Sequence, residues 1–164
     1  MTEKNTPPLL ALVDGSNYIY RAFYGIPSLT NSKGFPTNAI YGFTTMLMKL
    51  LRDLSPDYIV VTFDLKGPTT RHGEFDNYKA TRKPMPDDLI PQIPSIKDVV
   101  RAFSICILEK QGIEADDIIG ALTVQASRRG WRTAIISGDK DLMQLIDDRV
   151  TMVDTMKEKT YDAE

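Results

Sequence analysis

The sequence predicts an α/β fold in which a mostly parallel central sheet is flanked by helices and carries a projecting basic arch. Short apolar runs rich in β-branched residues recur along the chain, as buried parallel strands require. Stretches in which apolar residues follow helical spacing lie between several of these runs. Alternation of strands with helices is typical of a layered α/β domain.

Five strands and two helices are expected, in this order. The strands are LLALV (9–13), YIVVTF (58–63), ICIL (105–108), TAIIS (133–137) and VTMV (150–153). One helix is expected over 37–54, and another begins at ADDIIG (115–120) and stops before Gly130. Cys106 lies inside an apolar run and is expected to face the core.

The segment 66–95 fits this alternation least well, because it contains five prolines and two glycines. Its first part, about 66–86, is expected to form the projecting arch. Between Lys66 and Lys83 there are five basic residues against two acidic ones, interleaved with Phe75 and Tyr78. Basic residues mixed with aromatic ones indicate a segment that faces phosphates.

The composition of the chain, 42% hydrophobic and 26% charged, indicates one domain of 164 residues with an ordinary core. The first apolar run is stopped at once by Asp14, which is too soon for a signal peptide or a membrane span, so we expect a cytoplasmic protein with no membrane partner. A single cysteine excludes a disulfide framework, and a single histidine, His72, argues against a zinc site.

Seven carboxylates are expected to converge on one edge of the sheet. Asp14 and Asp64 directly follow strands, and two more carboxylates follow TAIIS after one glycine. Three others crowd the start of a helix in GIEADDIIG (112–120). The full set is Asp14, Asp64, Glu114, Asp116, Asp117, Asp139 and Asp141. Carboxyl ends of parallel strands form the ligand crevice of such sheets, so these side chains can meet.

Crowded carboxylates repel one another, and bound divalent cations relieve that repulsion. Oxygen ligands without cysteine or histidine favour Mg²⁺ or Mn²⁺, and the set can hold two ions, or one directly and another through water. The net charge of −2 does not argue against nucleic acid. Once these seven carboxylates are set aside, 15 of the 22 acidic residues remain against 20 basic ones.

Other interpretations of the same residues are available. Taken singly, Asp14 and Asp64 suit a turn or a helix cap as well as a metal site. A phosphatase with an aspartate nucleophile would need a second aspartate where the chain has Ser16. A metal-dependent adhesion motif, Asp-x-Ser-x-Ser, would need a hydroxyl ligand where the chain has Tyr18. The combination of carboxylates on several strand ends favours the shared metal site.

The chain resembles the 5′ nuclease domains found at the N-terminus of bacterial DNA polymerase I, within the wider flap endonuclease family. The resemblance covers residues 9–160 and rests on LVDGSNYIYRAF, SLTNSKGFPTNAIYGF, VTFDLKGPTTRHGEFDNYKATRKPMPDDL, GIEADDIIG and SGDKDLMQL. It implies a PIN-like (Rossmann-like) fold and Mg²⁺-dependent cleavage of branched or 5′-ended DNA, with Mn²⁺ able to substitute. It also implies a polymerase domain as a fused partner.

Residue roles follow from the resemblance position by position. The seven carboxylates are expected to be metal ligands, and Lys79 and Arg82 of YKATR are expected to contact the scissile phosphate as catalytic residues. DNA-binding residues are expected to be Arg21, Arg71, Tyr78 and Lys83.

The chain ends at Glu164, before two further aspartates and a helix-hairpin-helix segment that the family contains. Residues 1–164 are therefore expected to be the N-terminal part of a 5′ nuclease domain. The helix-hairpin-helix DNA-binding part is expected to be absent. The alternatives to a flap endonuclease are a metal-dependent PIN-type ribonuclease and a catalytically incomplete DNA-binding fragment.

Overall fold

The computed structural model describes residues 6–65 and 84–163. Within these residues, six strands form one sheet in the order β3-β2-β1-β4-β5-β6. The first five pair in parallel, and β6 runs antiparallel to β5. The prediction of an α/β fold with a mostly parallel sheet is confirmed.

The expected strands and helices lie close to their predicted bounds. The strands are β1 (Leu9–Asp14), β2 (Tyr58–Thr62), β3 (Cys106–Leu108), β4 (Arg132–Ile136), β5 (Val150–Asp154) and β6 (Lys159–Tyr161). The helices are α1 (Gly15–Gly25), α2 (Asn38–Leu54), α4 (Ile93–Ala102) and α5 (Ala115–Arg128), with 3-10 turns η1 (Ile90–Gln92) and η2 (Lys140–Leu145). Helices α1 and α4 and strand β6 were not predicted.

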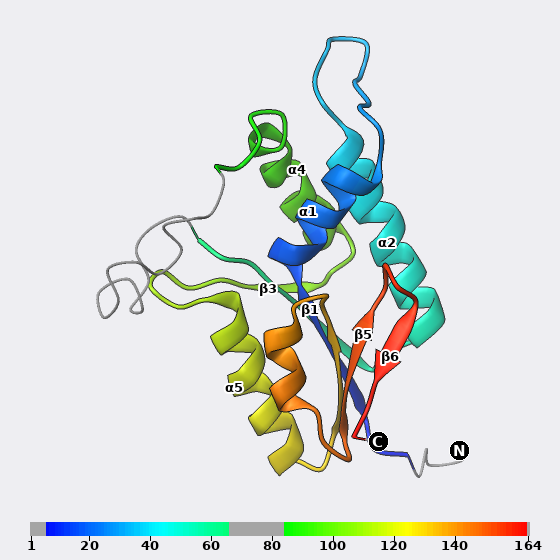
Figure 1. Ribbon diagram of the computed structural model, residues 1–164, viewed down its shortest axis with the longest axis vertical. Coiled ribbons are helices and arrows are strands. Elements are labelled where there is room, and N and C mark those ends of the chain that lie inside the picture. Colours follow the sequence, from blue (N-terminus) through cyan, green and yellow to red (C-terminus); the bar gives the residue numbers. More distant parts are fainter. Residues whose placement is uncertain (1–5, 66–83, 164) are drawn as a thin grey trace.

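Helices cover both faces of the sheet (Figure 1). Val13 and Ile136 point toward α1, α2 and α4, where they join one buried cluster. Leu12 and Ile135, their neighbours along the same strands, join a second cluster with α5 and η2. Successive side chains of a strand point to opposite faces, so a strand covered on both sides is apolar throughout. This is why continuous apolar runs identified the strands.

Cys106 is exposed at the start of β3, so the prediction that it faces the core was wrong. β3 is an edge strand of the sheet, and within the described residues it pairs only with β2. An apolar run on an edge strand has the same pattern as one on a central strand, and the sequence does not distinguish the two.

Between α1 and α2, the segment 26–37 projects beyond the helices (Figure 1). An antiparallel bridge between Thr30 and Pro36 closes it. The predicted basic arch is a different segment, 66–86, and its residues 66–83 lie outside the described part of the chain. No described helix has both the length and the apolar character that crossing a bilayer requires.

Candidate active site

The strand order places a reversal in the middle of the sheet. From β1 the chain continues to β2 on one side, and after β3 it returns through α5 to β4 on the other side of β1. Open parallel sheets bind ligands at the carboxyl ends of the strands beside such a reversal. Here Asp14 ends β1, and Ser137 to Asp139 directly follow β4.

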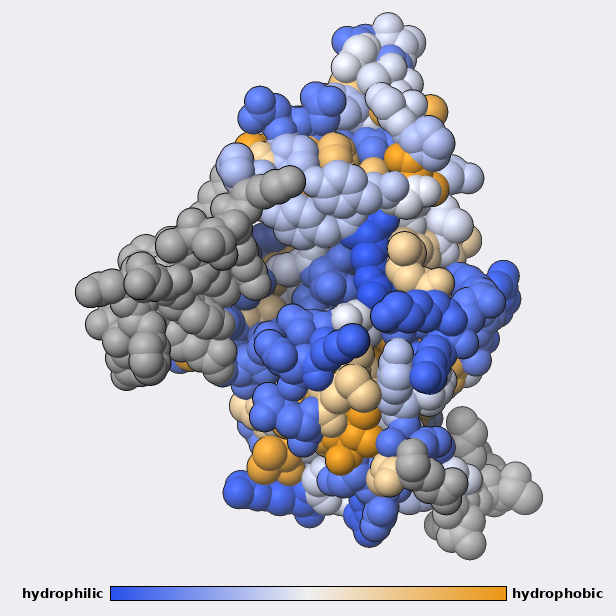
Figure 2. Space-filling model, in the orientation of Figure 1, coloured by the Kyte–Doolittle hydropathy of each residue, from blue (hydrophilic) through white to orange (hydrophobic). Residues whose placement is uncertain are grey.

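A cleft of about 1240 Å³ opens at this edge of the sheet, between α1, α5 and η2. In the space-filling view, hydrophilic residues gather across the middle of the molecule, below α1 and beside η2 (Figure 2). All seven predicted carboxylates line this cleft: Asp14, Asp64, Glu114, Asp116, Asp117, Asp139 and Asp141. The structure therefore brings together side chains that are up to 127 positions apart in the sequence (14 to 141).

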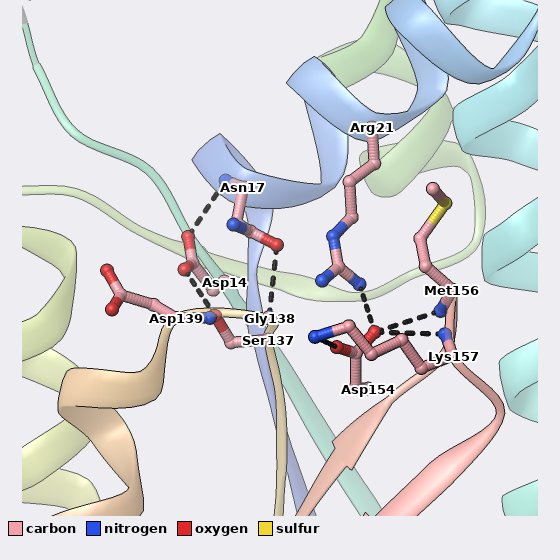
Figure 3. A network of polar contacts seen from close by, with 9 residues as sticks. All are labelled: Asp14, Asn17, Arg21, Ser137, Gly138, Asp139, Asp154, Met156 and Lys157. Carbon is pink, nitrogen blue, oxygen red and sulfur yellow. Dashed lines mark hydrogen bonds and ion pairs between the residues drawn. The ribbon is translucent and has the colours of Figure 1, made fainter.

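Asp14 is fixed by two hydrogen bonds at the centre of this arrangement (Figure 3). Its Oδ1 accepts from the Asn17 backbone N–H at 3.0 Å, which caps α1, and its Oδ2 accepts from the Ser137 hydroxyl at 2.8 Å. The Ser137 oxygen in turn accepts from the Asp139 N–H at 3.1 Å. One buried serine thus sets the spacing between a carboxylate of β1 and a carboxylate of the loop after β4.

Asp64 is held from two directions. Its backbone N–H donates to the Ser16 hydroxyl at 2.9 Å, and its Oδ1 accepts from the Ala115 N–H at 2.9 Å. Asn17 makes a similar link on the other side, because its Oδ1 accepts from the Gly138 N–H at 3.2 Å. Neighbouring residues at the start of α1 therefore fix both adjacent loops.

Gly15 allows this approach because a Cβ there would lie 2.6 Å from the Thr62 carbonyl oxygen and 2.5 Å from the Phe63 ring. In DGSN (14–17), each residue consequently has a structural task in the cleft. Our sequence reasoning assigned no site role to Ser16, Asn17 or Ser137. The available signal was their position in the sequence: Ser16 and Asn17 closely follow Asp14, and Ser137 lies two residues before Asp139.

The electrostatics of the cleft favour a cation. Burial, together with the negative charges of Asp14, Asp139, Asp64 and Glu114, raises the pKa of Asp116 to about 7. Burial also raises the pKa of Asp14, against hydrogen bonds that lower it. These carboxylates lie close enough to repel one another, and a bound cation would relieve that repulsion.

The donor set fits a hard divalent cation, because the charged neighbours that raise the pKa of Asp116 are all carboxylates and oxygen ligands suit Mg²⁺ or Mn²⁺. Within the described residues, no three Asp, Glu, His or Cys side chains form a closed coordination site. The cleft therefore gathers the carboxylates without converging them on one point.

The basic residues predicted to contact DNA fall into two groups. Lys79, Arg82, Arg71, Tyr78 and Lys83 lie outside the described residues, so their roles stay predictions. Arg21 is described and lies beside the cleft, in an ion pair with Asp154. Lys97 and Lys140, which we did not predict, line the cleft itself. Lys97 pairs with Glu109 and lies 5.2 Å from the centre of the Phe63 ring.

The two rival interpretations fit this geometry poorly. Ser16, at the position where the phosphatase pattern needs an aspartate, holds the backbone of Asp64. Tyr18, at the last position of the adhesion pattern, is fully buried and packs edge-to-face on Phe43. It therefore cannot ligate an ion in the cleft.

The sequence model of one protein family, described as "5'-3' exonuclease, N-terminal resolvase-like domain", matches residues 9–164. The chain belongs to this family. The resemblance noted from the motifs is thereby confirmed, and the cleft described above is the carboxylate-lined cleft of a 5′-3′ exonuclease N-terminal domain.

Curated relatives are longer than this 5′-3′ exonuclease N-terminal domain. DNA polymerase I of Caldicellulosiruptor bescii is 46% identical over 155 residues, which are 93% of this chain and 18% of that protein. The 5'-3' exonuclease of Aquifex aeolicus is 43% identical over 155 residues, which are 94% of this chain and 54% of that protein. The chain thus spans about half of one relative and less than a fifth of the other.

Solved structures share the fold of this 5′-3′ exonuclease N-terminal domain. The T5 D15 protein, co-crystallised with metal ions, superposes with a TM-score of 0.70 at 22% identity, over 94% of this chain and 58% of that one. The D15 flap endonuclease of bacteriophage T5, in a pseudo-enzyme-product complex with DNA and metal ions, gives a TM-score of 0.63 at 23% identity, over 94% and 57%. These similarities show the fold.

Proposed function

We propose that this chain is the catalytic part of a divalent-metal-dependent 5′-3′ exonuclease and structure-specific flap endonuclease. It hydrolyses phosphodiesters of DNA that has 5′ ends or flaps, acts in replication and repair in the cytoplasm, and is joined to a polymerase domain. The observation that carries the proposal is the acidic cleft at the sheet reversal, in a chain that belongs to a 5′-3′ exonuclease family.

The carboxylates of the cleft would hold the Mg²⁺ or Mn²⁺ ions. Asp14, at the centre, is kept in place by Ser137 and Asn17, and the carboxylates of α5 and of the loop after β4 face it across the cleft. When bound, such ions activate water and stabilise the charge of the leaving oxygen. The chain itself supplies no nucleophile in this scheme. Its carboxylate side chains would hold the ions in the cleft.

Lys79 and Arg82 are proposed to contact the scissile phosphate, where positive charge is most effective as negative charge develops. Lys140 lines the cleft and adds positive charge between two carboxylates. In the same arch, Arg71, Tyr78 and Lys83 are proposed to bind DNA. The aromatic ring of Tyr78 would stack on a base or sugar.

The experiment is cleavage of a 5′-labelled flap substrate with Mg²⁺, with Mn²⁺ and with EDTA, using this chain and a chain extended to the length of the Aquifex relative. Asp14→Ala is expected to abolish cleavage and to keep DNA binding, because removing a carboxylate also relieves repulsion of the phosphates. Asp147→Asn is the matched control. Asp147 accepts backbone N–H groups in the turn before β5, away from the cleft.

The same substrates made of RNA, and a binding assay without metal, cover the alternatives. Faster cleavage of RNA than of DNA by both chains would favour a PIN-type ribonuclease. DNA binding with no metal-dependent cleavage by either chain would favour a non-catalytic DNA-binding fragment. Equal cleavage by the Asp14→Ala variant and the wild type would remove the acidic cleft from the mechanism.

A further inference from the structure

Asp154, at the end of β5, forms a buried ion pair with Arg21 of α1 (Figure 3). Arg21 Nη1 lies 3.0 Å from Asp154 Oδ1, and the side chains are 15% and 2% exposed. Neither residue lines the acidic cleft within the described part of the chain. The pair therefore lies beside the cleft and does not form part of its lining.

Asp154 is itself firmly fixed. Its Oδ1 also accepts from the backbone N–H groups of Met156 at 3.1 Å and Lys157 at 3.2 Å, and Lys157 Nζ lies 3.5 Å from Oδ2. Burial alone would raise the pKa of this carboxyl, but these hydrogen bonds and the Arg21 charge together lower it. Asp154 is consequently a rigid anion that fixes one end of the Arg21 side chain.

The other side of the guanidinium packs against Gly138. A Cβ on Gly138 would lie 1.5 Å from Arg21 Nη2, so this contact requires glycine. Asn17, one helical turn before Arg21 on the same face of α1, accepts the Gly138 N–H at 3.2 Å. Gly138 directly precedes Asp139. Two side chains of α1 thus hold the backbone from which the carboxylates after β4 project.

We propose that Asp154 is a positioning residue of the acidic cleft: through the guanidinium of Arg21 it fixes Gly138, and so the placement of Asp139 and Asp141. This inference rests on the proposed function, since it assigns the cleft to metal binding. A residue that orients ligands from behind alters metal affinity although it touches neither ion nor substrate. The resemblance to 5′ nucleases implied a phosphate contact for Arg21 and no role for Asp154.

The test compares Asp154→Asn, Arg21→Gln and Gly138→Ala with the double variant Asp154→Asn/Arg21→Gln. Asparagine keeps an oxygen for the Met156 and Lys157 N–H groups, so the turn after β5 is retained while the negative charge is lost. Gly138→Ala displaces the guanidinium without changing Arg21 itself. Asp147→Asn, before the other end of β5, is the matched control.

Two measurements are made on the whole chain. Calorimetry with Mn²⁺ is expected to give a dissociation constant raised about 10-fold in each single variant, and not further in the double variant, because both act through one contact. Hydrogen exchange of the metal-free chain is expected to speed up over 137–142 in the same variants. The control is expected to match the wild type in both.

Unchanged Mn²⁺ affinity and unchanged exchange over 137–142 in Asp154→Asn would overturn the inference, whatever its thermal stability. So would additive effects in the double variant. If Arg21→Gln weakened DNA binding alone and left Mn²⁺ affinity intact, Arg21 would be a phosphate contact and not a positioning residue. Flap cleavage by the wild type is judged separately: its failure would remove the proposed function and leave these two measurements to decide on Asp154.

Discussion

Oδ1 of Asp64 accepts a hydrogen bond from the backbone N–H of Ala115, 2.9 Å away and 51 positions later in the chain. Glu114, the residue at the N-cap position of α5, makes no side-chain cap of its own. The carboxylate after β2 therefore caps the helix that presents Asp116 and Asp117 to the cleft. The same side chain is both a candidate ligand and a structural support for two others.

These two tasks of Asp64 can be separated by substitution. Asp64→Asn keeps an oxygen for the Ala115 N–H, so thermal stability is expected to stay close to that of the wild type while Mn²⁺ affinity falls. Asp64→Ala loses the cap as well, at a cost of about 1 kcal/mol. Calorimetry and thermal denaturation measure the two effects. Asp57→Asn is the control, because Asp57 accepts the Leu9 N–H at the far end of the sheet.

Stability without metal is expected to fall as the pH rises toward 7. The pKa of Asp116 is raised to about 7 in the folded chain, above the ordinary value of 3.8 for an aspartate, so the folded state binds this proton more tightly than the unfolded state does. The resulting stability is fully present below pH 3.8 and is lost as the pH passes through about 7. Burial also raises the pKa of Asp14, so this residue makes the stability depend on pH in the same direction.

The measurement is thermal denaturation in EDTA between pH 5 and 8, on the wild type and on Asp116→Asn. The variant is expected to show a flatter dependence on pH. Asp154, whose pKa is lowered, acts in the opposite direction and only below about pH 4, outside this window. Saturating Mg²⁺ is expected to remove most of the slope, and to stabilise by about 2.7 kcal/mol at 100 times its dissociation constant. Identical slopes for the two proteins would contradict the prediction.

Ser137→Ala is expected to destabilise the cleft at two points, because the single hydroxyl that it removes takes part in two hydrogen bonds. The Asp14 carboxylate loses a donor in a buried setting and the Asp139 N–H loses its acceptor in a partly buried one, at a cost of roughly 1–3 kcal/mol. Since the serine hydrogen bond lowers the pKa of Asp14, its removal raises that pKa, and Mn²⁺ binding should need a higher pH. Denaturation and pH-dependent calorimetry check this, with Ser127→Ala on α5 as control.

Gln92 is a buried polar residue that does not line the acidic cleft. Its Oε1 accepts from the Ala39 and Ile40 N–H groups at the start of α2, and its Nε2 donates to Asn38 and to the Asp88 carbonyl. Gln92→Leu leaves these groups unpaired, so we expect a loss of at least roughly 1–3 kcal/mol in unfolding free energy with Mn²⁺ affinity unchanged. Gln125→Leu on α5 is the matched control. A change in Mn²⁺ affinity would show coupling to the cleft.

Lys79→Ala and Arg82→Ala are expected to slow single-turnover cleavage much more than they weaken DNA binding. Their charges should matter most as the phosphate becomes more negative, and such interactions contribute roughly 2–4 kcal/mol each. Single-turnover kinetics and equilibrium binding on one flap substrate separate the two effects. Weaker binding with an unchanged single-turnover rate would reassign both residues to general phosphate attraction.

Much of this fold follows from local patterns, and the exceptions have physical reasons. Continuous apolar runs identified five strands because both faces of the sheet are covered. Helix α4 was missed because Pro91 and Pro94 suggest a loop, whereas proline is well accommodated in the first turn of a helix. β6 is three residues long and too short for a pattern.

In the site, the acidic residues are predictable from the sequence, whereas the residues that hold them in place are not. Carboxylates on several strand ends are conspicuous, because independent caps have no reason to recur on one edge. Ser16, Asn17 and Ser137 are small polar residues of the kind that most turns contain. Their partners are 48 to 123 positions away, and only the pairing of the strands reveals them.

The bond between Ser137 and Asp14 spans 123 positions, and this has a consequence for synthesis. During translation the residues of β1 leave the ribosome first, and those of β4 follow more than 100 codons later. The cleft cannot assemble until β4 has paired with β1, a contact of high sequence separation that forms slowly. A nascent chain of this family therefore has no acidic cleft until β4 has emerged, and premature termination before β4 yields a product without the loop that bears Asp139.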